Sequence, residues 1–368
     1  PMCGIAGIIN YRNDPVKDIL NMNRAMLHRG PDAGDYWLDP ERKVVLGHRR
    51  LSIVDLSANG SQPMKSADGR YVIVYNGEIY NYQGLEQKLR ADGCELHLRG
   101  TSDTEVILEA FSFYGMEKTL SLMKGMFAIA LYDRQEQQLY LTRDRVGEKP
   151  LYYGMVNGAF AFASDIECIR QIEGFSNQVN RAVFPLYFQY GYIPAPYSIY
   201  EKIFKLEPGK TLRLNCKTLD YKIQTYWSMT EVALNGEKNR FTGSEEEAAG
   251  ELERLLKHAI RGQMIADVPL GAFLSGGIDS SLVVSLMQAI SPNKVKTFTI
   301  GFDVDKYNEA RYAKEIAAHL GTEHTELYVT SQDAFTIMQH MPDSFTEPFA
   351  DSSQIPTMLV SKMTREHV

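Results

Sequence analysis

The apolar pattern of this 368-residue chain changes near residue 241. Upstream, short strand-like runs predominate, and several alternate apolar and polar side chains, as residues 138–142 do. Alternation of this kind is typical of antiparallel strands with one buried face. Downstream, apolar strands alternate with helices, which is typical of a parallel sheet covered by helices. The sequence therefore predicts two domains of different architecture, and its length also exceeds what one ordinary core accommodates.

The first predicted domain covers residues 3–214. Its expected strands lie at residues 4–10, 43–46, 70–75, 126–132, 138–142, 151–154 and 159–163. Three amphipathic helices interrupt these strands, at residues 16–26, 82–92 and 104–114. Strands that pack an apolar face against helices predict an α+β domain built from antiparallel sheets and helices.

The second predicted domain covers residues 243–368 and begins with a long amphipathic helix at residues 245–264. Strands at 268–274, 296–302 and 323–329 then alternate with helices at 280–290 and 308–320. This order predicts an α/β domain with a doubly wound parallel sheet. Residues 215–242 are expected to form the linker between the domains, because the polar stretch 228–242 contains the turn-forming pair Asn235-Gly236.

Charge and cysteine content exclude several classes of protein. The formal net charge is −7, whereas broad binding to nucleic acids or anionic membranes needs a basic surface. No apolar run approaches the ~18 residues that span a bilayer. The four cysteines (Cys3, Cys94, Cys168 and Cys216) form no CxxC pair, so neither a zinc site nor a disulfide framework is predicted. We expect a cytoplasmic protein without nucleic-acid or membrane partners, and the sequence leaves a homodimer open.

A loop rich in glycine and serine follows the first strand of the second domain. Its sequence is Ser-Gly-Gly-Ile-Asp-Ser-Ser, at residues 275–281, and a helix follows it. Glycines let backbone amides approach an anion, serines donate hydroxyl hydrogen bonds, and a helix N-terminus adds positive potential. The pattern therefore predicts a phosphate site. Asp279 fits such a site if Mg²⁺ bridges its carboxylate to phosphate oxygens, and otherwise it caps the helix.

This loop does not follow the GxxxxGK[ST] pattern of the Walker loop. It closely resembles the PP-loop of the N-type ATP pyrophosphatases, which cleave ATP between its α and β phosphates. The resemblance implies ATP as a substrate, Mg²⁺ at Asp279 and formation of an adenylate. The residues that it implies in contact with ATP or pyrophosphate are Leu274, Ser275, Gly276, Gly277, Ile278, Asp279, Ser280, Ser281 and Ile300. Leu274 and Ile300 are at the same time ordinary candidates for the core.

The third residue of the chain, Cys3, opens the run Cys-Gly-Ile-Ala-Gly. A thiol is mostly protonated at pH 7 and needs a base to act as a nucleophile. The α-amine of a chain end, with a pKa of about 7.7 to 8.0, suits that role. Cys3 carries such an amine only if Pro1 and Met2 are removed. The alternative interpretation is a small buried cysteine near the start of a strand.

Five further motifs follow in order along the first domain. They are His-Arg-Gly-Pro-Asp at 28–32, Arg-Leu-Ser-Ile-Val-Asp at 50–55, Tyr-Asn-Gly-Glu-Ile-Tyr-Asn at 75–81, Thr-Ser-Asp-Thr-Glu at 101–105 and Arg-Asp-Arg-Val-Gly-Glu-Lys-Pro-Leu-Tyr-Tyr at 143–153. With Cys3 and the loop at 275–281, they make the whole chain resemble a class II glutamine amidotransferase of the asparagine synthetase type. The resemblance implies an Ntn-hydrolase-like sandwich followed by a PP-loop ATP pyrophosphatase domain.

The resemblance also implies a glutaminase site in the first domain. Its implied catalytic residues are Cys3, Asn76 and Gly77, with the Asn76 amide and the Gly77 N–H stabilising an oxyanion. Its implied glutamine-binding residues are Arg50, Leu51, Ser52, Ile53, Val54, Asn76, Gly77, Glu78 and Asp103. Arg50 suits the α-carboxylate of the substrate and Asp103 its α-ammonium group. Taken alone, Asn76-Gly77 suggests a hairpin turn, Arg50 a surface charge and Asp103 a helix N-cap.

The implied reaction is the glutamine-dependent, ATP-consuming amidation of a carboxylate through an acyl-adenylate. In an asparagine synthetase the acceptor is aspartate, and the products are asparagine, glutamate, AMP and pyrophosphate. One alternative is a paralogue that amidates another carboxylate, such as a uronic acid in surface-polysaccharide assembly or a β-lactam-type precursor. The phosphate loop argues against a sugar-phosphate or phosphoribosyl transferase that shares the first domain. The presence of Cys3, Arg50 and Asp279 argues against a non-enzymatic interaction protein.

The chain stops at Val368, before the second acidic, glycine-rich motif that family members place in the ATP site. We therefore expect an incomplete second domain, with glutaminase capacity but little synthetase activity in the sequence as given. The segment 347–356 resembles a bacterial subgroup in which acceptors other than free aspartate occur. In it, Asp351 with the two serines that follow suits either acceptor or ATP binding, or the capping of a helix over residues 354–364.

Overall fold

A computed structural model describes residues 3–302 and 310–365, and the chain divides into two compact units. The first unit comprises residues 1–239 with 346–349, and the second comprises residues 240–345 with 350–368. Each unit has buried hydrophobic clusters of its own. Among the described residues, no helix has the length and apolar character that crossing a bilayer requires.

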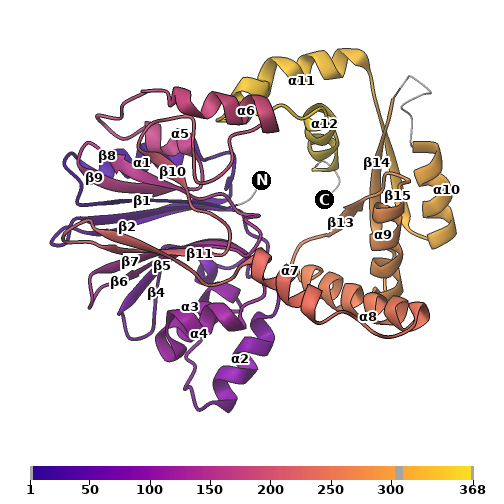
Figure 1. The fold of residues 1–368 in the computed structure, drawn as a ribbon, viewed down its shortest axis with the longest axis horizontal. Coiled ribbons are helices and arrows are strands. Elements are labelled where there is room, and N and C mark those ends of the chain that lie inside the picture. The colour runs from indigo at the N-terminus through magenta and orange to yellow at the C-terminus, as the bar shows by residue number, and fades with distance from the viewer. Residues whose placement is uncertain (1–2, 303–309, 366–368) are drawn as a thin grey trace. The chain divides into compact units, whose positions relative to one another are not determined.

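Two six-stranded antiparallel sheets form the centre of the first unit (Figure 1). One has the order β10-β8-β9-β1-β3-β2 and consists of β1 (Gly4–Ile9), β2 (Ala33–Asp39), β3 (Val44–Arg50), β8 (Tyr152–Val156), β9 (Ala159–Ala163) and β10 (Ile203–Lys205). The other has the order β12-β11-β7-β6-β5-β4 and consists of β4 (Met64–Lys65), β5 (Tyr71–Ile79), β6 (Gly125–Asp133), β7 (Gln138–Arg143), β11 (Lys210–Asn215) and β12 (Tyr221–Thr225).

The two sheets pack face to face, and helices cover their outer faces. The inner cluster takes side chains from both sheets, including Leu46 and Val74. The outer faces are covered by α1 (Pro15–Ala25) and α5 (Ile166–Arg170) on the first sheet, and by α2 (Tyr82–Ala91), α3 (Asp103–Tyr114) and α4 (Met116–Leu122) on the second. Along β5, Val74 points to the inner cluster and Ile73 to the helices, so both faces of the strand are buried. The predicted α+β sandwich is confirmed.

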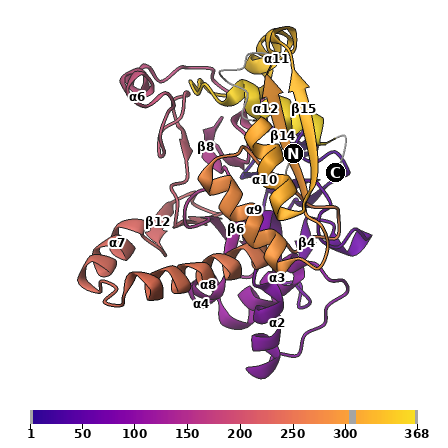
Figure 2. The same cartoon turned by 90° about the vertical axis from the view of Figure 1, so that its right-hand side faces the viewer.

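A parallel three-stranded sheet forms the centre of the second unit, with the strand order β13-β14-β15. Its strands are β13 (Gly271–Phe273), β14 (Lys296–Phe302) and β15 (Glu323–Val329), and its helices are α8 (Glu245–Gln263), α9 (Ile278–Ile290), α10 (Ala310–Leu320), α11 (Ser331–Ser344) and α12 (Gln354–Thr364). Both α10 and α12 contact β14 and β15, and Figure 1 shows them on opposite sides of the sheet. Figure 2 shows α9 and α10 on the side nearer the viewer. The predicted α/β architecture is confirmed.

The linker expected at residues 215–242 differs from the structure. Strand β12 lies within that range and pairs with β11, which extends a sheet of the first unit. Helix α7 (Met229–Lys238) follows, and the first unit ends at Asn239. All residues of β12 are exposed. Its sequence, Tyr-Lys-Ile-Gln-Thr, does alternate apolar and polar residues, but the polar stretch 228–242 that follows it favoured a linker.

Other element boundaries shift by a few residues. The strand expected at 268–274 is reduced to β13, since Pro269 has no N–H to donate to a ladder. The helix expected at 280–290 begins earlier, at Ile278. Residues 308 and 309 of another expected helix lie outside the described residues. The sequence did not predict β2, whose first residues are exposed, or the short α6 (Phe184–Tyr190).

Candidate active site

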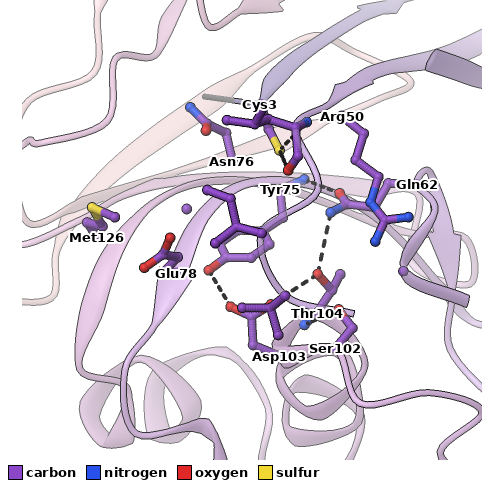
Figure 3. Close-up of a pocket in the computed structure, with 15 residues that line it drawn as sticks. Cys3, Arg50, Gln62, Tyr75, Asn76, Glu78, Ser102, Asp103, Thr104 and Met126 are labelled. Carbon is purple, nitrogen blue, oxygen red and sulfur yellow. Dashed lines mark hydrogen bonds between the residues drawn. The ribbon is translucent and has the colours of Figure 1, made fainter. Parts of the chain in front are cut away.

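A pocket in the first unit collects the expected glutamine-site residues (Figure 3). We call it the Cys3 pocket. Its lining residues are Cys3, Arg50, Leu51, Ile53, Val54, Gly60, Gln62, Tyr75, Asn76, Gly77, Glu78, Ser102, Asp103, Thr104 and Met126. They come from the residue before β1, the end of β3 and the segment after it, the second half of β5, the N-terminus of α3 and the start of β6. Motifs far apart in the sequence therefore meet in one place.

Cys3 lies directly before β1 at one side of this pocket. Its Sγ accepts a hydrogen bond from the Leu51 N–H at 3.4 Å, and Arg29 Nε donates to the Cys3 carbonyl at 3.3 Å. Burial raises the pKa of the Cys3 thiol, while the positive charge of Arg50 acts in the opposite direction. A thiol in this environment is neutral at pH 7 and needs a base before it can attack.

Asn76 lies on β5 with only 1% of its surface exposed. Neither its Oδ1 nor its Nδ2 has a hydrogen-bond partner among the described residues. Buried amides almost always have partners, because leaving one unpaired costs about 1–3 kcal/mol. Since Asn76 lines the Cys3 pocket, its unpaired amide is available to a bound ligand. It lies within a strand and not in the hairpin turn that the Asn-Gly pair alone suggests.

The backbone N–H of Gly77 is directed away from β6. Phe127 lies opposite it in the β5–β6 register, but the N–H and carbonyl of Phe127 both bond to Asp144. In an antiparallel ladder each residue directs both groups to one side, so Gly77 cannot bond to Phe127. A Cβ atom on Gly77 would lie 2.1 Å from the Met126 carbonyl oxygen, which excludes any other residue here.

Three alternate N–H groups of β5 therefore point to the same edge of the strand. The Tyr75 N–H donates to Gln62 Oε1 at 2.6 Å, and the Ile79 N–H donates to Asp103 Oδ2 at 3.0 Å. The Gly77 N–H lies between them along this edge, and both Gly77 and Asn76 line the pocket. Two neighbouring residues of the lining thus each have a donor group, one a backbone N–H and the other a side-chain amide.

Asp103 is the first residue of α3, and the neighbouring Ser102 is its N-cap, with Ser102 Oγ accepting from the Thr104 N–H at 3.1 Å. The N-cap position is therefore taken by Ser102 and not by Asp103, whose Oδ1 accepts from the Thr104 hydroxyl at 3.4 Å. Its Oδ2 accepts a hydrogen bond from the Tyr75 hydroxyl at 2.9 Å, as Figure 3 shows. Burial raises the pKa of Asp103, while hydrogen bonds from Ile79 and Tyr75 act in the opposite direction.

Arg50 ends β3 and is buried, with 7% of its surface exposed, so it is not a surface charge. Its Nη1 donates to the Ser57 carbonyl at 2.7 Å, and its Nη2 donates to the Asp55 carbonyl. These bonds fix the plane of a guanidinium group that still lines the pocket. Glu78 lines it as well, and burial, with the nearby charge of Asp103, raises the pKa of Glu78. The pocket thus contains one cation and two carboxyl groups.

One expected glutamine-binding residue lies outside the lining. Ser52 donates its N–H to Asp32 Oδ2 at 2.7 Å and does not line the pocket. Sequence reasoning missed six residues that do line it, namely Gly60, Gln62, Tyr75, Ser102, Thr104 and Met126. Tyr75 precedes Asn76 within a recognised motif, so its position was a usable signal. Nothing in the sequence near Gln62 or Met126 indicated their role.

The phosphate loop, residues 275–281, comprises the end of the turn after β13 and the first residues of α9, which begins at Ile278. Gly277 is the N-cap of α9 and offers no capping side chain, and Ile278 is 86% exposed. The hydroxyl groups of Ser275 and Ser280 lie 2.9 Å apart and bond within the loop. Gly276 has a φ of +81°, which strongly favours glycine. The predicted loop between strand and helix is present, with its helix N-terminus open.

The residues of this loop suit the phosphates of ATP better than they suit Mg²⁺. The open N-terminus of α9 and the serine hydroxyls suit phosphate oxygens. Leu274 is buried in a hydrophobic cluster directly before the loop, and Ile300 packs against another cluster, so both are core residues. Among the described residues, no group of three or more His, Cys, Asp or Glu suits a metal. Asp279 would therefore hold Mg²⁺ only together with phosphate oxygens.

The segment after α11 separates into two parts. Glu347 belongs to the first unit, where its carboxylate lies 2.6 Å from Lys205 Nζ. Asp351 belongs to the second unit, where its carboxylate accepts from the Ser353 N–H at 3.0 Å, just before α12 begins at Gln354. This is the geometry of the capping interpretation of Asp351.

Comparison with known proteins matches two families, one on each side of the boundary between the units at residues 239 and 240. Residues 2–227 match the glutamine amidotransferase domain family, and residues 251–368 match the asparagine synthase family. A putative glutamine-hydrolysing asparagine synthetase 2 of Methanocaldococcus jannaschii is 35% identical over 389 residues, which cover 100% of this chain and 72% of that protein. The glutamine-hydrolysing asparagine synthetase 1 of Bacillus subtilis is 33% identical over 372 residues, covering 100% of this chain and 56% of that protein.

A solved structure, that of glutamine phosphoribosylpyrophosphate amidotransferase from B. subtilis, aligns with 90% of this chain and 91% of that chain at 15% identity and a TM-score of 0.47. The chain spans only about half the length of several of its curated relatives, such as the 56% of the B. subtilis protein. The two family matches nevertheless cover the two units in order, and sequence similarity extends over the whole chain. The chain therefore belongs to the glutamine-hydrolysing asparagine synthetase family.

Proposed function

We propose that the first unit hydrolyses glutamine with Cys3 as the nucleophile. The observation that carries this proposal is the unpaired, buried amide of Asn76 beside the outward-directed N–H of Gly77, in the pocket that Cys3 lines. Two preorganised donors next to a nucleophile are what a tetrahedral oxyanion requires. A buried amide kept without a partner costs stability, which supports a functional role.

In the proposed reaction, the Cys3 thiolate attacks the carbonyl carbon of the glutamine side-chain amide. The oxyanion that forms accepts hydrogen bonds from Asn76 Nδ2 and the Gly77 N–H. The C–N bond then breaks, the nitrogen takes up a proton and leaves as ammonia, and a thioester remains on Cys3. Water hydrolyses the thioester, which releases glutamate and restores the thiol. One complete cycle consumes glutamine and water, releases ammonia and glutamate, and restores the Cys3 thiol.

The base in this scheme is the α-amine of Cys3, in protein from which Pro1 and Met2 have been removed. Burial raises the pKa of the thiol, so the group does not ionise by itself at pH 7. The α-amine has a suitable pKa and belongs to the same residue. Glutamine is held at its other end, with its α-carboxylate on Arg50 and its α-ammonium group on Asp103 and Glu78.

For the complete protein we propose amidation of aspartate to asparagine, with ammonia from the first site attacking an aspartyl-adenylate at the second. The names of the relatives and the open N-terminus of α9 after the phosphate loop support this assignment. ATP would bind along residues 274–281, with Ile300 near the nucleotide. Mg²⁺, held by Asp279 and phosphate oxygens, would neutralise negative charge on the phosphates.

Two measurements test the proposal. The chain produced to begin at Cys3 should release glutamate from glutamine, whereas the same chain with Pro1 and Met2 retained should not. Full-length protein should release pyrophosphate when aspartate, ATP and glutamine are present. If aspartate gave no pyrophosphate release and a uronic acid did, the uronic acid would take the place of aspartate as the proposed acceptor. No glutamate release from the chain that begins at Cys3 would refute the glutaminase itself.

A further inference from the structure

Asp55 ends the motif at residues 50–55, but the proposed reaction gives it no role. It is buried, with 6% of its surface exposed, and does not line the Cys3 pocket. Its backbone has a φ of +53°, in the left-handed region that non-glycine residues rarely adopt. A strained, buried carboxylate next to a candidate site needs a physical explanation.

On one side, Asp55 organises the turn that holds Arg50. Its Oδ1 accepts hydrogen bonds from the N–H and the hydroxyl of Ser57. The carbonyl groups of Asp55 and Ser57 in turn accept from the two terminal nitrogens of Arg50. A Cβ atom on Gly60 would lie 2.2 Å from Arg50 Nη2, so this turn encloses the guanidinium closely. The direction of the Arg50 side chain therefore depends on the turn that Asp55 closes.

On the other side, Asp55 bonds to the segment that leads into α3. Its Oδ2 accepts from the Thr101 N–H at 2.9 Å, two residues before Asp103. A Cβ atom on Gly100 would lie 2.1 Å from the same oxygen, so only glycine allows this approach. Glu105 holds the segment from behind, since its carboxylate accepts from the backbone N–H groups of Arg99 and Gly100.

One carboxylate therefore joins the two segments that carry the opposite charges of the pocket. Arg50 belongs to the end of β3, and Asp103 belongs to α3 in the layer of helices on the second sheet. Burial alone would raise the pKa of Asp55, but hydrogen bonds from Ser57 and Thr101 outweigh that effect and lower it. The group is thus a carboxylate at neutral pH, able to accept on both oxygens at once.

We propose that Asp55 is a positioning residue that sets the separation of Arg50 and Asp103, and so gives the site its selectivity for a free α-amino acid. This inference rests on the proposed glutaminase function. The carboxylate and the ammonium group of an α-amino acid are bonded to the same carbon and lie close together. A site that binds both groups must therefore hold Arg50 and Asp103 at a matching distance. Asparagine at position 55 would direct an NH₂ group toward the N–H of either Ser57 or Thr101, and the hydrogen bond to that residue would be lost.

The test compares glutamine with 4-aminobutanamide, which has the same amide and amine but no α-carboxylate. Protein that begins at Cys3 is used as wild type and as the variants Asp55→Asn, Gly100→Ala and Asp68→Asn. Asp68 is the matched control, because its carboxylate also accepts from a turn N–H, that of Arg70 at 3.0 Å, but lies outside the pocket. The readouts are kcat and KM for glutamine and the ratio of kcat/KM for the two amides.

Asp55→Asn should raise the KM for glutamine about tenfold or more, with kcat changed by less than about threefold, because the chemistry at Cys3 is untouched. The preference for glutamine over 4-aminobutanamide should fall by the same factor. Gly100→Ala should reproduce this result, and it serves as the test if Asp55→Asn does not fold. Asp68→Asn should leave both quantities unchanged.

An unchanged preference in folded Asp55→Asn and Gly100→Ala proteins would overturn the inference. An equal loss with both amides would also overturn it, since that is the result of a general loss of structure. If wild-type protein fails to hydrolyse glutamine, the proposed function itself is wrong, and this outcome is distinct from the other two.

Discussion

The Cys3 pocket and the phosphate loop differ in how their polar groups are held. In the pocket, Arg50, Asn76 and Asp103 are all buried, and charged groups are fixed by bonds from neighbouring segments. In the loop, Ser275 and Asp279 are exposed, and the serine hydroxyls bond only to nearby loop atoms. The first arrangement suits a small molecule held in one orientation, whereas the second leaves a helix N-terminus open.

This difference indicates where preorganisation matters. Oxyanion stabilisation depends on donors that are fixed before the reaction, because donors that must reorient spend part of the stabilisation energy on their own reorganisation. Phosphate binding at a helix N-terminus depends on backbone N–H groups that the helix itself fixes, so side chains there need less support. Substitutions in the pocket should therefore have larger effects than substitutions in the loop.

The largest expected effect is that of Cys3→Ala. Glutamate release should fall by a factor of order 10⁴ or more, because the nucleophile is lost. In full-length protein, amide synthesis from added ammonia should persist. Cys94→Ala is the control, since this cysteine is partly buried but does not line the pocket. Glutamine hydrolysis that survived Cys3→Ala, measured by a coupled glutamate assay, would remove Cys3 from the mechanism.

Asn76→Ala should lower kcat by about 10²- to 10³-fold, the usual cost of one oxyanion donor, with little change in KM. The free energy of unfolding should hardly fall, because the amide has no partner to lose. Asn23→Ala is a control of the opposite kind. Its Nδ2 donates to the Asp35 carbonyl at 3.1 Å, so the variant should lose about 1 kcal/mol of stability and keep its activity. If Asn76→Ala lost stability and kept its kcat, Asn76 would have a structural role and not a catalytic one.

Ser275→Ala should have a smaller effect, confined to the second unit. We expect ATP to bind about tenfold more weakly, as titration calorimetry of full-length protein would show, since one hydroxyl donor to a charged phosphate is removed. Ser291→Ala, which removes a hydroxyl bonded to the Asn293 carbonyl, is the control. Glutamate release should be the same in both variants. ATP affinity unaffected by Ser275→Ala would argue against phosphate binding at this residue.

The smallest effect concerns the pH dependence of stability. His48 is buried, and desolvation lowers its pKa to about 3, so the folded protein keeps it neutral while it donates from Nε2 to the Tyr75 carbonyl at 3.2 Å. Between pH 6.5 and 3 the unfolded chain binds a proton that the folded protein does not, so stability falls as the pH falls. From pH 7 to 5.5 the loss is about 1 kcal/mol.

His48→Asn keeps a donor near this carbonyl but removes the titration. Chemical denaturation should therefore show that the stability difference between wild type and His48→Asn becomes smaller as the pH falls from 7 to 5.5. A difference that stays constant with pH would mean that His48 does not stay neutral in the folded unit.

Local patterns in the sequence were enough to predict the architecture of both units, whereas the proposed site residues came from the resemblance that the ordered motifs carry. Alternating runs such as β7 predict antiparallel strands, because the pleat places alternate side chains on opposite faces. The loop after β13 is recognisable because glycine and serine at a strand-to-helix turn have a specific chemical use. The exposed edge strand β12 was assigned to the linker because of the polar stretch that follows it, although its own residues alternate between apolar and polar.

The sequence by itself determined the two architectures, and it named Cys3 as the proposed nucleophile together with its expected neighbours. Only the tertiary structure decided the state of each group. It showed that Ser102 caps α3 while Asp103 faces Tyr75, that the Asn76 amide is unpaired, and that Asp55 joins the segments of Arg50 and Asp103. The physical reason is that periodicity and propensity act between neighbours in sequence, whereas hydrogen bonding of a buried group depends on segments that only folding brings together.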